Sequence, residues 1–176
     1  SLVGSEMCIR DSSGNKDPEE IACKTSVGLY LFEDNYPYRG DFDFNDAVVQ
    51  YEIRDYYQSK NRAKQIAVQL MATGSHMSNS FGFRDSKGFQ PFLSGLKGYR
   101  NVYAAQAFEP VGEPVVQTLY GDVVPCLKNE SEYYIYPSSF NTAEYPSVLD
   151  IPVSDPDDAS WKFEWPQEMQ LSLIHI

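Results

Sequence analysis

The chain has 176 residues and a formal net charge of -11, which suits one domain with a sizeable core and an acidic surface. The acidic balance argues against nucleic acid or an anionic membrane as a partner, because both require clustered Lys and Arg. No apolar run approaches the length of a membrane span.

The two ends differ in character from the rest of the chain. Residues 1–12 (SLVGSEMCIRDS) and 171–176 (LSLIHI) resemble translated sequencing-adaptor read-through and fit no element that we can place. We therefore expect a single β domain over residues 13–170, truncated at its C-terminus. Within this range Cys23 and Cys126 could form one disulfide or remain two buried thiols, and their spacing leaves both possibilities open.

Apolar positions in the first half of the chain recur with a period of two rather than 3.6. SVGLYLFE at 26–33 is β-branched and aromatic, and AVVQYEIRDYY at 47–57 and KQIAVQLMA at 64–72 alternate apolar and polar side chains. These three segments predict β-strands.

The second half of the chain has shorter strand candidates separated by Gly and Pro. They are 81–83, 102–108 (alternatively a helical turn), 115–120, 133–136 and WKFEW at 161–165. DIPVSDPDD at 150–158 is expected to be a loop. Several short strands with turns between them favour an all-β fold of the β-sandwich or jelly-roll type.

The densest group of side-chain oxygens lies in FEDNYPYRGDFDFND at 32–46. Crowded carboxylates repel one another, which raises the pKa of some of them and strains the loop, and a bound cation removes that cost. The loop contains no Cys or His, and oxygen ligands alone suit Ca²⁺. The predicted ligands are Glu33, Asp34, Asp41, Asp43, Asn45 and Asp46.

Phenylalanines alternate with these acidic residues. In an extended loop Phe42 and Phe44 would point to one side and Asp41 and Asp43 to the other, so we expect the rings to enter the core while the oxygens converge. Aspartate suits a regular strand poorly, so the strand should begin at about Ala47.

Other interpretations of the loop are weaker. A solvated acidic turn would not require interleaved aromatic rings. An EF-hand would need glycine where Asp46 stands and helices on both sides of the loop. A glycosyltransferase with a D-x-D motif would need an α/β nucleotide-binding domain, which the strand pattern does not predict.

LYLFEDNYPYRGDFDFNDAVVQYEI, residues 29–53, resembles the LruC-type domain of secreted and surface proteins of bacteria. The matching positions are Phe32, Glu33, Asp34, Tyr36, Pro37, Gly40, Asp41, Phe42, Asp43, Asn45 and Asp46. ATGSHMSNSFGF at 72–83 is similar to a second block of that family. The resemblance implies an extracellular, lipoprotein-associated β domain with calcium-like acidic loops and no established catalytic activity.

The other residues that could have a functional role are one histidine and two tryptophans, and the sequence supports such a role less strongly. His76 has no second histidine or nucleophile near it in sequence, so no catalytic residue is predicted. Trp161 and Trp165 would share one face of a strand, where they could pack in the protein or stack on sugar rings.

Two functions follow from these observations. The first is a non-enzymatic, calcium-stabilised module of a secreted or surface-anchored bacterial protein, with a structural or adhesive role. The alternative is a glycan-binding module that uses the calcium-ordered loop and an aromatic platform, with a surface glycan or an extracellular protein as partner.

Overall fold

The computed structural model describes residues 5–7, 22–57, 60–102, 109–137 and 147–156. This part of the chain is built from β-strands and contains no α-helix, which confirms the all-β prediction. Its strands are β1 (Ser5–Met7), β2 (Ala22–Phe32), β3 (Ala47–Asp55), β4 (Ala63–Ala72), β5 (Asn79–Asp85), β6 (Gly88–Leu96), β7 (Val111–Tyr120), β8 (Val124–Lys128), β9 (Tyr134–Ile135) and β10 (Val148–Pro152). No helix in the described ranges is long and apolar enough to cross a membrane.

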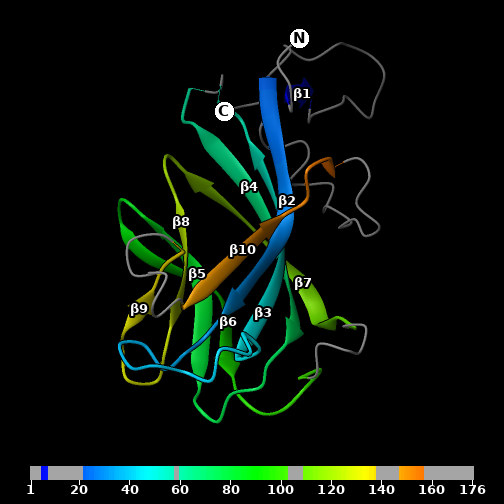
Figure 1. The fold of residues 1–176 in the computed structure, drawn as a ribbon. Helices are drawn as coiled ribbons and strands as arrows, with labels where there is room; N and C mark the ends of the chain where they lie inside the picture. Colours follow the sequence, from blue (N-terminus) through cyan, green and yellow to red (C-terminus); the bar gives the residue numbers. More distant parts are fainter. Residues whose placement is uncertain (1–4, 8–21, 58–59, 103–108, 138–146, 157–176) are drawn as a thin grey trace.

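The strands form two antiparallel sheets (Figure 1). The larger sheet has the order β1-β2-β3-β4-β7, and β10 pairs with β2 on the same side as β1, farther along the strand. The smaller sheet has the order β6-β5-β8-β9. The chain passes from one sheet to the other after β4, β6, β7 and β9.

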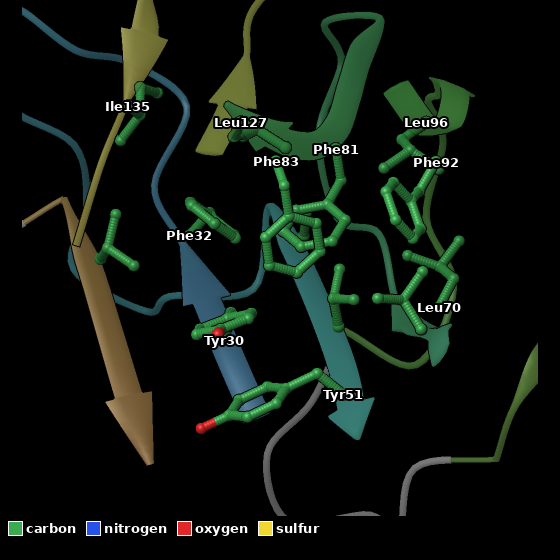
Figure 2. Close-up of a cluster of buried hydrophobic side chains, with 14 of the residues drawn as sticks. Tyr30, Phe32, Tyr51, Leu70, Phe81, Phe83, Phe92, Leu96, Leu127 and Ile135 are labelled. Carbon is green, nitrogen blue, oxygen red and sulfur yellow. The ribbon is translucent and has the colours of Figure 1, made fainter. Parts of the chain in front are cut away.

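An aromatic core fills the space between the sheets (Figure 2). Tyr30 and Phe32 from β2 contact Phe81 from β5 with ring centroids 6.0 and 5.8 Å apart. Phe83 packs edge-on against Phe92 at 5.1 Å within the smaller sheet. Burial of such rings is the main source of stability in a domain of this size, because each removes a large apolar area from water.

The alternating segments of the first half form strands close to their predicted bounds. The prediction that a strand begins at about Ala47 is confirmed by β3, and 64–72 falls within β4. The candidates at 81–83, 115–120 and 133–136 contribute to β5, β7 and β9.

The prediction of a loop over residues 150–158 is wrong at its start, because Asp150, Ile151 and Pro152 belong to β10. Strand β6 was also missed, since Gly88, Pro91 and Gly95 interrupt its apolar pattern. Both are edge strands, where proline is tolerated because one side of the strand makes no ladder hydrogen bonds. WKFEW at 161–165 and most of 102–108 lie outside the described residues.

The two cysteines of the expected domain do not pair with each other. Cys126 is a free, buried thiol on β8, whereas Cys23 on β2 is disulfide-bonded. The possibility of a Cys23–Cys126 disulfide is therefore excluded.

Candidate metal centre

The acidic loop connects two paired strands, and the pairing brings its ends together. Phe32 lies opposite Ala47 at the end of the β2–β3 ladder, so Glu33 and Asp46 are the next residues on either side. The backbone N–H of Glu33 donates to the carbonyl of Ser147 at 2.8 Å, which extends the order of the sheet by one residue. The register of the hairpin therefore forces two carboxylates to face one another.

Three of the predicted ligands converge. Carboxylate oxygens of Glu33, Asp41 and Asp43 all lie within 4.8 Å of one another. Glu33 is 3 % exposed, whereas both aspartates are exposed, so the cluster has a buried base and an open mouth. The backbone N–H of Phe44 donates to Glu33 Oε1 at 2.5 Å and holds that carboxylate in place.

Gly40 makes room for this carboxylate. A Cβ atom at position 40 would lie 2.2 Å from Glu33 Oε2, closer than any real contact. Gly40 therefore allows the Glu33 carboxylate to lie close to the backbone, because a side chain at position 40 would force Glu33 Oε2 to shift.

The backbone between the aspartates is left-handed at alternate residues. Phe42 and Phe44 have φ angles of 60° and 52°, and the Oδ1 atoms of Asp41 and Asp43 each accept a long hydrogen bond (3.4 Å) from the backbone N–H two residues on. These Asx turns shorten the distance between Asp41 and Asp43, which would be about 6.6 Å along an extended strand.

The prediction that the two phenylalanine rings enter the core is wrong. Both rings are half-buried, with centroids 6.5 Å apart, and the Arg39 guanidinium lies 5.0 Å from the centre of the Phe42 ring. The physical reason is the left-handed backbone at Phe42 and Phe44, because the alternation of sides that was expected applies only to an extended chain.

Asp34 and Asp46 fasten the loop to the rest of the molecule. Asp46 Oδ2 accepts from the backbone N–H of Asp34 at 2.8 Å. Asp34 Oδ2 accepts from the Ser75 hydroxyl and from Asn79 Nδ2 at 2.9 Å. Asn79 is the first residue of β5 and Ser75 lies in the turn before it, so the Asp34 carboxylate joins the acidic loop to the smaller sheet.

Asn45 and Asn129 complete this framework from side-chain amides. Asn45 Nδ2 donates to the carbonyl of Val102 at 2.9 Å, and the Asn45 carbonyl accepts from the backbone N–H of Gly74 at 2.9 Å. Asn129 Nδ2 donates to the carbonyl of Asp34 at 2.8 Å and to that of Tyr36 at 3.2 Å. Thus Asp34, Asn45 and Asp46, predicted as ligands, are engaged with protein donors or acceptors beside the three-carboxylate cluster.

The crowding has the predicted effect on acidity. Burial, reinforced by the charge of Asp46, raises the pKa of Glu33 to about 8 even though the Phe44 N–H lowers it. Burial and the adjacent Asp34 carboxylate raise the pKa of Asp46 to about 7, against the lowering effect of the Asp34 N–H. Burial and contact with Asp41 also raise the pKa of Asp43. The prediction of raised carboxyl pKa values is confirmed.

A cavity of about 810 Å³ opens beside the cluster. Its walls include the acidic loop, the turn at residues 74–77, Tyr99 and Val102. The Tyr99 hydroxyl lies 2.7 Å from His76 Nδ1, and the two rings meet edge-on with centroids 4.9 Å apart.

Ser75, Asn79 and Asn129 are site residues that sequence reasoning missed. For Ser75 and Asn79, the only signal in the sequence was the resemblance of residues 72–83 to a second family block. For Asn129 the sequence carries no signal, because its contacts with Asp34 and Tyr36 span more than 90 residues.

The converging groups are oxygen donors of the kind that bind a hard cation. All three donors are carboxylates, the buried one is fixed by a backbone N–H, and the exposed ones leave room for further oxygen ligands or water. Such a donor set suits Ca²⁺ better than Zn²⁺ or Cu²⁺, which prefer nitrogen and sulfur.

Comparisons with protein-family models, with curated proteins and with solved structures find no match. The weaker ligand-binding candidates, Trp161 and Trp165, lie outside the described residues.

Proposed function

We propose that this chain is a calcium-stabilised, non-catalytic β-sandwich module of a secreted or surface-anchored bacterial protein, with a structural or adhesive role. Glu33, Asp41 and Asp43 supply the carboxylates that hold the ion, and Asp34, Asn45 and Asp46 position the loop around it. The resemblance of residues 29–53 to the LruC-type domain supports the extracellular setting.

The convergence of three carboxylates from one loop carries the proposal. Without a cation, the loop must keep Glu33 buried beside other acids, which explains why the pKa of Glu33 is raised to about 8. A calcium ion replaces the proton there and offsets the repulsion among all three groups. The ion therefore stabilises the loop most at a pH where the carboxyl groups would otherwise be charged.

The loop lies where such stabilisation matters for the whole domain. Asp34 and its backbone carbonyl are hydrogen-bonded to Ser75, Asn79 and Asn129, which belong to the region of the smaller sheet. An ion that orders the loop thus also reinforces the contacts between the two sheets.

Calorimetric titration of Ca²⁺ into chelator-stripped protein tests this proposal. We expect one binding event in the wild type and a loss of affinity of at least about tenfold in Asp43→Asn, because a calcium ligand loses its charge. Asp122→Asn, at an exposed residue in the turn after β7, is the matched control and should bind like the wild type. Absence of heat in the wild type, or equal losses in both variants, would contradict the proposal.

A further inference from the structure

The outer face of the smaller sheet carries a group of aromatic and basic side chains, here called the aromatic face. It consists of Arg84, Phe89, Lys128, Tyr134 and Tyr136. Arg84 pairs with Phe89 and Lys128 with Tyr134 in the strand registers, and directly opposite residues lie on one face of a sheet. Their sequence neighbours Phe83, Leu127 and Ile135 point into the core, so the group points away from it.

The two rings reach across the sheet from its opposite edges. Phe89 lies on edge strand β6 and Tyr134 on edge strand β9, yet their ring centroids are only 5.6 Å apart, at 63°. Gly82 on β5 permits this, since a Cβ atom there would lie 2.9 Å from Phe89 Cε1. Cys126, on the same face of β8, is fully buried. The aromatic face is therefore a layer of rings lying over the two central strands.

A guanidinium group is held in this layer. Arg84 Nη1 donates to the Tyr136 hydroxyl, and its guanidinium lies 5.0 Å from the centre of the Tyr134 ring. Lys128 Nζ lies 5.8 Å from the centre of the same ring. The Arg84 side chain nevertheless remains exposed. An oriented, exposed guanidinium beside aromatic rings is suited to bidentate recognition of a carboxylate.

We propose that the aromatic face binds an oligosaccharide that carries carboxylate groups, such as a chain of uronic acids. The apolar C–H faces of the sugar rings would pack on Phe89 and Tyr134, and a uronate would pair with Arg84, with Lys128 nearby. In a chain of net charge -11, these two cations provide local charge complementarity for an anionic ligand.

Other anionic partners fit the aromatic face less well. A peptide that adds a strand would pair beside edge strand β6 or β9, whereas the rings of the aromatic face lie over β5 and β8, which are paired on both sides. Nucleic acid carries one charge per about 1.7 Å of duplex, and an acidic protein repels so dense a polyanion. The aromatic face is also separate from the acidic loop, so this inference does not depend on calcium.

The test is a calorimetric titration with hexagalacturonate in the presence of a chelator, which removes any contribution from calcium. We expect binding of hexagalacturonate and none of a neutral glucose hexamer at the same concentration. Arg84→Gln should weaken binding about tenfold, since a charge-assisted hydrogen-bonded pair is lost. Arg84→Lys, which keeps the charge without the planar fork, should weaken it as well.

Arg62→Gln, in the turn before β4 on the other sheet, is the matched control and should bind like the wild type. Thermal melts of each variant establish that it is folded. Equal weakening in Arg62→Gln would mean that net charge alone attracts the sugar and would overturn the proposal. So would equally tight binding of hexaglutamate, which would identify an acidic peptide as the partner, or no binding of hexagalacturonate.

Discussion

Glu33 is the buried carboxyl group at the base of the acidic loop, and its environment determines how the loop responds to charge. It is the first residue beyond the β2 strand, it is 3 % exposed, and it faces Asp46 across the end of the hairpin. Burial and the nearby charge of Asp46 destabilise the charged form of this carboxyl group, and this raises its pKa. The same carboxylate becomes favourable once a cation shares the site.

The pH dependence of stability follows from this residue. The pKa of Glu33 is about 8 in the folded protein against an ordinary value of 4.5, so the native state binds the proton more tightly. In chelator, stability should therefore fall as pH rises between about 4.5 and 8, by up to about 1.4 kcal/mol per pH unit for one carboxyl group. Glu33→Gln should make that fall shallower in urea unfolding at several pH values.

The matched control is Glu113→Gln, at an exposed acid on β7. It should keep the pH dependence of the wild type. A wild-type protein that becomes more stable over this pH range in chelator would contradict the assignment of a buried, raised-pKa carboxyl group.

A substitution at Gly40 tests the close packing around Glu33. In Gly40→Ala the added Cβ would collide with Glu33 Oε2 and displace the carboxylate from the cluster. We expect calcium affinity to fall at least about tenfold, corresponding to about 1.4 kcal/mol or more. The measurement is calcium titration, and wild-type affinity in this variant would show that Glu33 Oε2 is not needed for the ion.

At the scale of single residues, sequence reasoning found the acids but not their geometry. Composition and spacing were enough to single out the acidic loop, from which the carboxylates of Glu33, Asp41 and Asp43 converge. The orientation of Phe42 and Phe44 could not be predicted, since a positive φ in non-glycine residues is uncommon and depends on the surrounding contacts.

At the scale of elements, the β2–β3 connection acts as a bridge between the sheets. Asn129, which follows β8, is 4 % exposed, and its side chain donates to carbonyls of Asp34 and Tyr36. Its Oδ1 accepts from the backbone N–H of Tyr133 at 2.9 Å, which closes the turn before β9. One amide thus joins the acidic loop to the smaller sheet.

Asn129→Ala should therefore affect both stability and calcium binding. The substitution leaves two carbonyls and one N–H without this partner, at a cost of about 2 kcal/mol or more for buried groups. Urea unfolding measures the loss of stability, and calcium titration should show weaker binding because the loop loses an anchor. Ser131→Ala, at an exposed residue of the same turn, should change neither. If the two variants behave alike, the bridge is unimportant.

The elements themselves were predictable where apolar and polar residues alternate. β3 and β4 carry a strong period of two, and β3 begins where the run of acids ends. β6 and β10 lack that signal because they contain Gly, Pro or Asp. β6 pairs with the adjacent strand β5, whereas β10 pairs with β2, more than 100 residues away. Long-range pairing of this kind leaves little trace in local sequence.

At the scale of the molecule, the fold is a two-sheet sandwich whose sheets are joined by an aromatic core and, at one end, by the acidic loop (Figures 1 and 2). The core holds the sheets together through apolar burial. The loop adds polar contacts whose strength depends on the charge state of its carboxylates. In our proposal, a bound calcium ion is what stabilises this end of the sandwich at neutral pH.

Thermal unfolding with and without calcium is the decisive test of whether an ion stabilises the acidic loop. Scanning calorimetry should show a higher Tm in Ca²⁺ than in chelator; at one hundred times Kd the gain is about 2.7 kcal/mol, or several degrees for a domain of this size. The gain should be largest above pH 7 and should be strongly reduced in Asp43→Asn. An unchanged Tm in calcium, or an equal rise in Asp43→Asn, would contradict the claim that the ion binds the acidic loop and stabilises the fold.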